Sequence, residues 1–547
     1  SFPDWYQTNG GTAAYYGLSR VKSSTSYDDR LQFGLFERVI PVDSTKTVAS
    51  IEFSYTGTDQ TYTSIFAVSA YLGGARTSEN NLYMISNAHF DTQWDWDVQT
   101  SIDQYVKNTL VDNFNLLDKF PDYVFNFEGA IKYMFAKEYY PDLYKRLKGY
   151  VASGRWHISG SSVDANDVMV PSAEAIIRNF LLGEKFYKKE FGVNGGNDIM
   201  LPDCFGFPYS LPTLAKYSGI VGFHSQKLSW GSAYNYSDFP NYGVWRGVDG
   251  SEILAIYQPG AYVNKYKENL SYNGDILSEI ISNKTKLGAA KTVRYYGTGD
   301  RGGSVDEETV DWLEKSLASS GPVHVNSVTP DQFFESVSSE ERSKLPVWDN
   351  ELPMTAHGAG CYTSQTNLKY WNRKGELLAD ATEKSSVVAN WLGTLPYQSQ
   401  TINDNWVRLL WHQFHDDLTG TSIPKAYTFT VNDLVAVQLD FSKTLNNANG
   451  AIARQINTQV QGTPIVVFNP LSIQREDIVE AKISTASEPT AISVYDPSGI
   501  VVPAQIVGYE NGQLSFIFKA NVPSLGYSTY DLRSEEHTSE LQSRFGI

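Results

Sequence analysis

The chain has 547 residues, of which 41% are hydrophobic and 19% charged, and its formal net charge is −17. This length is more than one hydrophobic core supports, so it predicts three or four domains. The acidic balance argues against nucleic acid or an anionic membrane as the main partner, because either would require a basic face. No apolar run approaches the ~20 residues of a membrane-spanning helix.

Cysteine and aromatic content add little to this classification. The two cysteines, Cys204 and Cys361, do not form a disulfide framework. Aromatic residues make up 14% of the chain, which suits sugar binding but equally an aromatic-rich core. The chain starts at Ser1 rather than Met, as a processed form or a fragment would. Oligomeric state and cellular location stay open, with a periplasmic or secreted location favoured.

The first part of the chain predicts β structure followed by an α/β domain. Residues 1–78 read as a β segment, the tail of a β-sandwich, with candidate strands at 47–55 and 64–71. Residues 79–304 alternate short apolar runs with amphipathic helices, which predicts an α/β catalytic domain with a mostly parallel sheet. Its expected strands are 82–88, 199–201, 220–224, 253–257 and 293–296.

Three helices of this domain have clear sequence signals. The first is expected over 128–140, and the second begins at Pro141. Ser172 is the expected N-cap of the third. The apolar residues of that third helix are predicted to face inward: Ile176, Ile177, Phe180 and Leu181.

Residues 305–460 predict a helical bundle, with helices over 368–392, 406–415 and 426–456. Residues 461–532 return to strands at 465–470, 478–483 and 514–518, the start of a β-sandwich domain with only one sheet's worth of chain. Residues 533–547 have no strand pattern and are expected to be a non-native tail.

The most informative motif is His89-Phe90-Asp91, which follows the apolar run 82–88. Because side chains on a strand alternate, His89 and Asp91 project to the same face. An imidazole beside a carboxylate at a strand end is half of a metal site or of an acid/base site. A pair of surface polar residues is the alternative explanation.

Three further motifs carry similar chemistry. Asp203 follows a short apolar strand, and Asp300 follows another in Gly297-Thr298-Gly299-Asp300. His412 and His415 lie in one turn beside two carboxylates. The alternatives are a helix N-cap for Asp203, a turn around Asp300 and a C-terminal helix cap for the histidines. Together the motifs favour a divalent metal such as zinc, with carboxylates left to cleave a glycosidic bond.

Six motifs, in order from about residue 80 to about residue 470, resemble the α-mannosidases of glycoside hydrolase family 38, of the bacterial type. The matching stretches are 87–94 (NAHFDTQW), 161–167 (SSVDAND) with 170–172 (VPS), 201–206 (LPDCFG), 225–230 (SQKLSW), 363–365 (TSQ) and 414–421 (FHDDLTGT). The resemblance implies an α/β catalytic domain, a helical bundle and then β-sandwich domains.

It also implies one zinc ion with His89, Asp91, Asp203 and His415 as ligands, leaving cobalt and calcium as alternatives. Asp203 would also be the nucleophile, forming a covalent glycosyl-enzyme, so that the reaction retains configuration. Asp300 would be the acid/base, with its carboxyl ~5–5.5 Å from that of Asp203.

The resemblance places the remaining site residues around the sugar. Trp94 would form the floor beneath the mannose, and Asp416 would bind the sugar or hold His415. Phe205, His357 and Lys227 would line the pocket of a mannose-containing glycan. Most C-terminal β domains of the family are absent from this sequence, so this polypeptide is expected to be poorly active or to fold poorly compared with a longer one.

Two other functions remain open. A metal-dependent carbohydrate hydrolase of the polysaccharide deacetylase type would use the metal to activate water, with no covalent sugar adduct. A non-catalytic glycan-binding protein would use the aromatic residues but would leave the acid and imidazole motifs unexplained.

Overall fold

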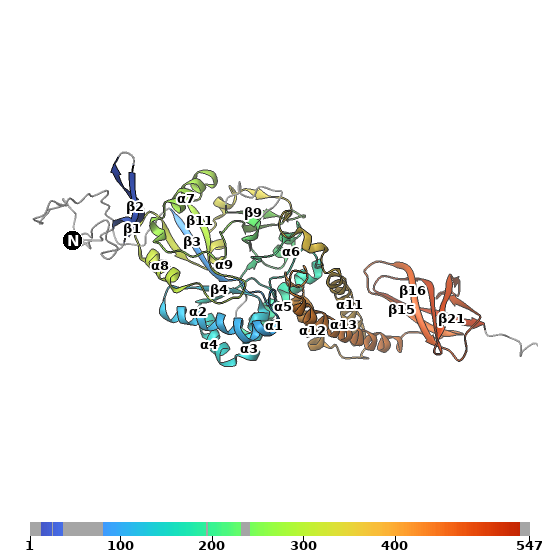
Figure 1. Ribbon diagram of the computed structural model, residues 1–547. Helices are drawn as coiled ribbons and strands as arrows, with labels where there is room; N and C mark the ends of the chain where they lie inside the picture. The colour runs from blue at the N-terminus through green and yellow to red at the C-terminus, as the bar shows by residue number, and fades with distance from the viewer. Residues whose placement is uncertain (1–12, 24–25, 37–79, 193–194, 231–240, 536–547) are drawn as a thin grey trace, which may run out of the picture.

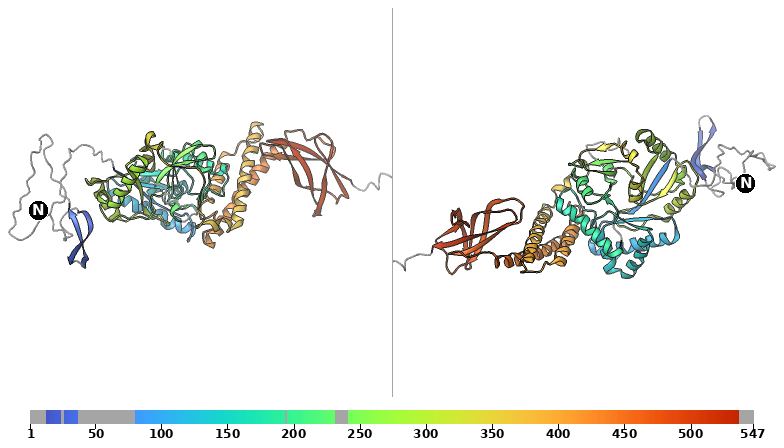
Figure 2. Two further views of the ribbon diagram at one scale, coloured as in Figure 1. Left: turned by 90° about the horizontal axis from the view of Figure 1, so that it is seen from above. Right: turned by 180° about the vertical axis from the view of Figure 1, so that it is seen from behind.

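The computed structural model describes residues 13–23, 26–36, 80–192, 195–230 and 241–535. An α/β part, a group of long helices and a β-sandwich follow one another along the molecule (Figures 1 and 2). Near the N-terminus, β1 (Ala13–Ser23) pairs with β2 (Ser26–Phe36) in antiparallel fashion. The candidate strands 47–55 and 64–71 lie outside the described residues.

The strand that precedes His89 lies at the centre of a parallel sheet. β3 (Asn81–Ala88) pairs in parallel with β11 (Lys291–Thr298) on one side and with β12 (His324–Ser327) on the other. Most of β3 is buried, as expected of a strand covered on both faces. Because β12 belongs to this sheet, the α/β part continues beyond residue 304, where the sequence had placed its end.

A second sheet is mixed and has the order β13-β9-β10-β8-β6. β6, β8 and β10 are parallel to one another, while β9 is antiparallel to β10. The predicted, mostly parallel α/β core is therefore confirmed. The bounds are β6 (Asp198–Met200), β8 (Gly222–His224), β9 (Tyr242–Arg246), β10 (Glu252–Ile256) and β13 (Val347–Trp348), and two further pairs are β4 (Phe125–Glu128) with β5 (Trp156–Ser159) and β7 (Gly206–Phe207) with β14 (Leu352–Pro353).

Helices surround these sheets. Ser172 caps α5 (Ala173–Phe191) as predicted, since its side chain accepts a hydrogen bond from the Ala175 N–H. The inward orientation predicted for Ile177 and Leu181 is wrong, because they are 39% and 54% exposed. The other helices are α1 (Val98–Thr100), the π-helix η1 (Ser101–Val106), α2 (Lys107–Lys119), α3 (Ala130–Tyr139), α4 (Pro141–Ala152), α6 (Leu211–Tyr217), α7 (Gly274–Leu287), α8 (Glu307–Ala318), α9 (Pro330–Glu335) and α10 (Ser339–Arg342), with short 3-10 turns η2 (Lys227–Trp230), η4 (Leu270–Tyr272) and η5 (Ala359–Thr363).

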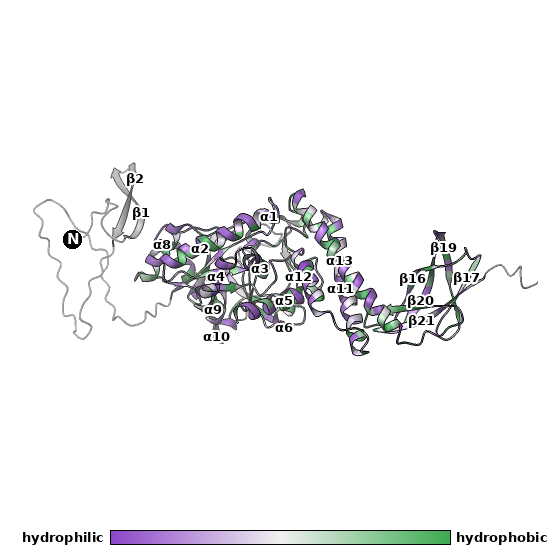
Figure 3. Ribbon diagram, turned by 90° about the horizontal axis from the view of Figure 1, so that it is seen from below, coloured by the Kyte–Doolittle hydropathy of each residue, from purple (hydrophilic) through white to green (hydrophobic). Residues whose placement is uncertain are grey.

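Three long helices form the predicted bundle: α11 (Thr366–Trp391), α12 (Ser399–Trp411) and α13 (Pro424–Ala453). Hydrophilic and hydrophobic residues alternate along α11 and α13 (Figure 3). α12 ends at Trp411, so His415 lies in the loop after the helix. The prediction that this helix includes His415 is therefore wrong. None of the helices in the described ranges has the length and hydropathy needed to cross a membrane.

The C-terminal strands build two sheets, where the sequence analysis expected only one. One has the order β15-β21-β17-β18 and the other β16-β20-β19, and their shared core includes Val494, Phe516, Phe518 and Tyr530. β21 extends three residues past the predicted boundary at 532, because residues 533–535 continue its pairing with β17. The bounds are β15 (Thr463–Asn469), β16 (Arg475–Ser484), β17 (Ala491–Tyr495), β18 (Val501–Val502), β19 (Ala504–Glu510), β20 (Gln513–Val522) and β21 (Gly526–Glu535).

Close packing of α5 against the segment after β5 gives a first prediction. A Cβ added to Gly183 would lie 2.5 Å from the carbonyl carbon of Ser162, which is backbone and cannot turn away. We expect Gly183→Ala to destabilise the α/β part by about 1–3 kcal/mol, the usual cost of overpacking. The control is Gly149→Ala in α4, where a Cβ meets nothing within 4 Å and alanine favours the helix. Thermal unfolding checks both, and an unchanged melting temperature for Gly183→Ala contradicts the packing argument.

Candidate active site

The carboxyl ends of β3 and β11 bring together three of the predicted site residues. His89 and Asp91 follow β3, and Asp300 follows β11, its parallel neighbour. The pairing continues past the strands, since the His89 N–H donates to Thr298 O at 3.0 Å and the Asp91 N–H to Asp300 O at 2.8 Å. An antiparallel bridge between Phe90 and Arg301 closes the same segment. These backbone bonds fix where the three side chains start.

Asp203 and His415 complete what we call the acid–imidazole cluster, which consists of His89, Asp91, Asp203 and His415. Asp91 Oδ1 lies 2.8 Å from His89 Nε2 and 3.3 Å from His415 Nε2. The distance from His415 Nε2 to Asp203 Oδ2 is 3.9 Å. Potential ligand atoms of His89, Asp203 and His415 all lie within 4.8 Å of one another. Asp91 contacts both imidazoles of this trio, so all four predicted metal ligands lie in one group.

His415 lies in the loop between α12 and α13, and one of its ring nitrogens already has a hydrogen-bond partner. Its Nδ1 lies 2.9 Å from the carbonyl oxygen of Ala165, and an isolated bridge joins Asn166 to Phe414 beside it. A carbonyl can only accept, so Nδ1 donates and Nε2 is left unprotonated in the neutral ring, free to act as a ligand. The ligand orientation of His415 therefore depends on the backbone of residues 165–166.

Several polar atoms of the cluster are buried without a hydrogen-bond partner. Within the described part of the chain these include His89 Nε2, Asp91 Oδ1 and His415 Nε2, which face one another in residues that are at most 2% exposed. Unpartnered buried polar atoms are costly, and where several of them converge a shared ligand would satisfy them together. Two imidazoles with two carboxylates are a donor set that suits zinc.

The cluster strongly perturbs its own ionisation. Burial alone would lower the pKa of both histidines, but the surrounding carboxylates outweigh it. They raise the pKa of His89, and they raise the pKa of His415 to about 10. Burial opposes the charged form of Asp91 too, yet the two imidazoles hold the pKa of that carboxyl far below its usual value.

Asp416 lies next to the cluster. Its Oδ2 is 3.7 Å from His415 Nε2, and the Thr421 hydroxyl donates to its Oδ1. Burial, together with the negative charge of Asp91 and Asp203, raises the pKa of the Asp416 carboxyl to about 7. The Asp416 carboxylate therefore lies beside His415, with one oxygen already occupied by Thr421.

Three of the predicted pocket residues gather next to Asp203. The Lys227 ammonium pairs with Asp203 Oδ1 and lies 4.1 Å from the centre of the Trp230 ring. Phe205 contacts the ring of His357, with centroids 5.8 Å apart, and lies 6.2 Å from the ring of His415. Burial and the Lys227 charge lower the pKa of His357. Phe205, Lys227 and His357 thus form one wall beside the carboxylate of Asp203.

Asp300 and Trp94 are the two remaining predicted site residues. Asp300 has a positive φ of 65°, unusual for a residue with a side chain, and its Oδ1 accepts a 2.8 Å hydrogen bond from the Tyr262 hydroxyl. Potential metal-ligand atoms of Asp300, Asp91 and His89 all lie within 4.8 Å of one another. The Trp94 ring is 37% exposed and packs edge-on against Trp96, so its predicted place beneath a sugar remains a prediction.

Sequence reasoning missed Tyr262, which also packs against the His89 ring with centroids 4.9 Å apart. It lies in the loop between β10 and α7, in a stretch with no strand or helix pattern and no neighbouring acid. Its backbone N–H donates to Gln226 Oε1, and Gln226 belongs to one of the recognised motifs. That contact is long-range and leaves no trace in the local sequence.

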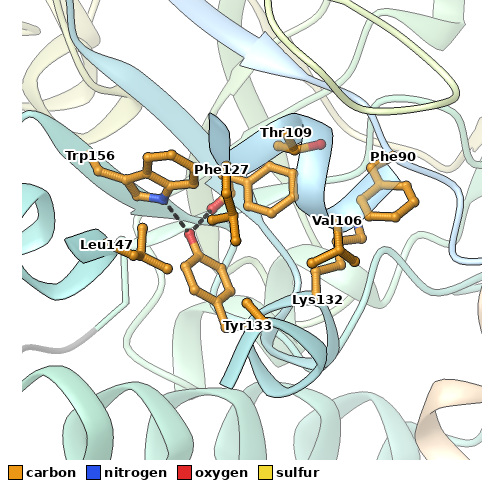
Figure 4. A pocket seen from close by; sticks show the side chains of 10 residues that line it. Phe90, Val106, Thr109, Phe127, Lys132, Tyr133, Leu147 and Trp156 are labelled. Carbon is orange, nitrogen blue, oxygen red and sulfur yellow. Dashed lines mark hydrogen bonds between the residues drawn. The ribbon is translucent and has the colours of Figure 1, made fainter. Parts of the chain in front are cut away.

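A fully buried ion network supports the segment that carries Asp91. Lys132 pairs with Glu128 and lies 3.2 Å from Asp164 Oδ1, while the Thr92 hydroxyl donates to Asp164 Oδ2 at 3.2 Å. Lys132 also lines a small cavity of about 10 Å³ with the rings of Phe90 and Phe127 (Figure 4). The same view shows the Tyr133 hydroxyl bonded to Trp156 and to the Phe127 carbonyl.

Two models of known protein families match this chain. The model described as "Glycosyl hydrolases family 38 N-terminal domain" matches residues 79–351, and the "Alpha mannosidase middle domain" matches residues 357–452. The chain is 30% identical over 391 residues to alpha-mannosidase G of Dictyostelium discoideum, covering 71% of this chain and 35% of that protein. It is 29% identical over 457 residues to an alpha-mannosidase of Saccharomyces cerevisiae, covering 80% of this chain and 40% of that protein. The chain therefore spans well under half the length of these relatives.

Solved structures agree on the fold. An alpha-mannosidase from Enterococcus faecalis V583 superimposes with a TM-score of 0.68 at 16% identity, covering 84% of this chain and 56% of that one. A glycosyl hydrolase family 38 protein from Enterococcus faecalis gives a TM-score of 0.62 at 16% identity, with 84% and 54% covered. The architecture is therefore shared over most of this chain.

The buried network generates the second prediction. We expect Lys132→Met to destabilise the protein by about 3–5 kcal/mol, because it leaves Glu128 and Asp164 as buried carboxylates without a cation. The matched control is Lys137→Met on the same helix, whose ion pair with Glu190 is half exposed and should change stability by no more than about 1 kcal/mol. Urea unfolding followed by near-UV circular dichroism compares the two, and equal effects would mean that the Lys132 network is not stabilising.

Proposed function

The chain belongs to glycosyl hydrolase family 38, and from that membership and the geometry of the cluster we propose that it is a retaining α-mannosidase that removes terminal α-linked mannose from glycans. One observation carries the proposal. Carboxylate oxygens of both Asp203 and Asp300 lie within 4.8 Å of ligand atoms on the His89 ring, at the edge where β3, β6 and β11 end. Two carboxylates flanking one small volume are what glycosidic cleavage requires.

Asp203 is the proposed nucleophile. Lys227 pairs with its Oδ1, which leaves Oδ2 on the side of His415. This oxygen attacks the anomeric carbon as the bond to the leaving oxygen breaks, giving a covalent mannosyl-enzyme. Water then attacks the same carbon and releases Asp203, so that two inversions give net retention. The ion pair with Lys227 keeps the side chain of Asp203 aligned.

Asp300 is the proposed acid and base. It donates a proton to the leaving oxygen in the first step and takes a proton from water in the second. The Tyr262 hydroxyl donates to Asp300 Oδ1, so the second carboxyl oxygen is the one available for proton transfer. The left-handed backbone at Asp300 and the following Arg301 bridge hold this carboxyl close to the sheet edge.

His89, Asp91, Asp203 and His415 are the residues that would hold a divalent metal, with zinc as the proposed ion. Their unpartnered buried atoms fit such an ion, and imidazole donors favour zinc or cobalt over calcium. When bound, zinc supplies Lewis acidity that holds the 2- and 3-hydroxyls of the mannose. Trp94, Phe205, His357 and Asp416 are the proposed contacts of the remaining sugar surface.

The nucleophile assignment gives the third prediction. Asp203→Asn should lower kcat on an aryl α-mannoside by at least about a thousandfold, because removal of a nucleophile eliminates the covalent step. The control Asp142→Asn changes an exposed carboxylate in the first turn of α4 and should leave kcat unchanged. A fluorinated mannosyl donor followed by peptide mass spectrometry should label Asp203 in the unmodified chain. Absence of any adduct together with full turnover favours a mechanism in which water attacks directly, as in a deacetylase-type hydrolase.

The metal assignment gives the fourth prediction. Zinc at one hundred times its Kd should stabilise the folded chain by about 2.7 kcal/mol for each site, measured as a rise in melting temperature after chelator treatment and zinc addition. His415→Gln should weaken binding at the acid–imidazole cluster by more than about tenfold, since even the loss of an outer hydrogen bond to a ligand costs about 10–100-fold. Unchanged zinc affinity in this variant would remove His415 from the ligand set.

A further inference from the structure

A second group of potential metal ligands lies away from the acid–imidazole cluster. It consists of His157 on β5, Asp198 at the first position of β6 and Asp331 in the first turn of α9. Potential ligand atoms of all three lie within 4.8 Å of one another. Asp198 begins β6, whereas Asp203 follows its carboxyl end, so the two groups are associated with opposite ends of the same strand. We call this set the β6-start cluster.

Each carboxylate of the β6-start cluster has one oxygen fixed by the protein. Asp198 Oδ2 accepts hydrogen bonds from the Ser159 hydroxyl at 2.8 Å and the Gly160 N–H at 3.0 Å, and it lies 2.6 Å from His224 Nε2. Asp331 Oδ1 accepts from the Asn197 N–H at 2.9 Å. The other Asp331 oxygen, Oδ2, is 3.5 Å from His157 Nε2. The protein therefore orients both carboxylates and leaves one oxygen of each for another partner.

The remaining atoms converge on a space that a glycine keeps open. Asp198 is fully buried, yet its Oδ1 has no hydrogen-bond partner among the described residues, and neither has His157 Nε2. A Cβ built on Gly196 would collide with Asp198 Oδ1 and would lie 3.1 Å from His157 Nε2. These two unpartnered atoms thus border the same small volume beside Gly196. The side chains of His157 and Asp331 are 19% and 20% exposed, so the cluster lies near the protein surface.

The surroundings carry negative charge that the protein does not neutralise. Glu184 and Glu335 lie close enough to Asp331 to interact with it electrostatically. Glu184 Oε1 is itself buried without a partner. Within the described ranges, the cationic side chains within ion-pairing distance of Asp198 and Asp331 are histidines, His224 and His157, and no lysine or arginine.

We propose that His157, Asp198 and Asp331 form a second divalent-cation site, suited to zinc or a similar transition metal, that is structural and separate from the acid–imidazole cluster. One imidazole and two carboxylates are three protein ligands, and the exposed side leaves a position for water. The ion would join α9 to β5 and β6 across 174 residues of sequence, from 157 to 331. Binding would therefore stabilise the native α/β part by restricting the unfolded chain and neutralising the buried charge.

The test uses the full chain. Isothermal titration with zinc measures affinity, and elemental analysis of the zinc-loaded chain after desalting measures stoichiometry. We expect two ions per chain, one of which is lost or weakened at least about tenfold in His157→Gln and in Asp331→Asn. The second substitution keeps an oxygen to accept from the Asn197 N–H, so it tests ligation with the local fold preserved. The matched control is Asp275→Asn, an exposed acid in the first turn of α7, which should keep two ions.

Variants of the first cluster separate the two proposals. His415→Gln should retain one ion, and that ion should still raise the melting temperature; adding His157→Gln should abolish both the ion and the rise. If His157→Gln and Asp331→Asn bind zinc like the unmodified chain, or if His415→Gln binds none, the second site does not exist. Loss of zinc in the His157 variant with none lost in His415→Gln would instead count against the acid–imidazole site.

Discussion

The parallel pairing of β3 with β11 is the constraint on which the rest of the site depends. Eight consecutive residue pairs, from Asn81 with Lys291 to Ala88 with Thr298, set the register of the two strands. The backbone bonds that follow carry this register into the loops, so that Asp91 and Asp300 emerge beside each other. A shift of one residue in that register would turn His89 and Asp91 away from Asp300. The positions of His89, Asp91 and Asp300 relative to one another therefore follow from sheet geometry.

The energetic cost of this arrangement is the burial of several ionisable groups in a small volume. His89, Asp91 and His415 are almost inaccessible to water, and charges so placed are stable only with partners. The protein surrounds the cluster with groups that cannot rearrange easily: the Ala165 carbonyl against His415, the Lys227 ammonium against Asp203, and the Lys132 network behind Thr92. Rigid surroundings of this kind hold ligands in place before any ion or sugar arrives, which lowers the reorganisation needed in the reaction.

The sequence predicted best where chemistry and local pattern coincide. His89, Asp91, Asp203 and Asp300 each follow an apolar run, and parallel strands place such positions at one sheet edge, so these residues were found together. Prediction failed where tertiary contacts decide the outcome. Ile177 and Leu181 fit a helical apolar stripe but face solvent, because the structure buries only part of the α5 surface. Tyr262 reaches Asp300 from a loop that has no periodic pattern.

The domain limits were less predictable for a related reason. β12 joins the sheet of β3, although it lies beyond residue 304, where the sequence pattern predicts the helical bundle. The second C-terminal sheet depends on short strands such as β18, which have too few residues to show alternation. The β6-start cluster was invisible in the sequence, since His157, Asp198 and Asp331 are far apart and none lies in a recognisable motif. Only the packing of α9 against the strands brings them together.

The bundle is as much a part of the site as the sheets are. His415 reaches the cluster from the loop after α12, and its place depends on how that loop docks onto residues 164–167. The Asn166 side chain donates to Leu410 O at 2.8 Å, and the Asp167 N–H donates to Gln413 O at 2.9 Å. Glu376 on α11 accepts both from the Ser172 N–H that begins α5 and from Gln413. These bonds cross from one part of the chain to the other, so a ligand set containing His415 forms only when the bundle is docked. The proposed four-residue ligand set of the acid–imidazole cluster therefore requires the α/β part together with α11, α12 and the loop before α13.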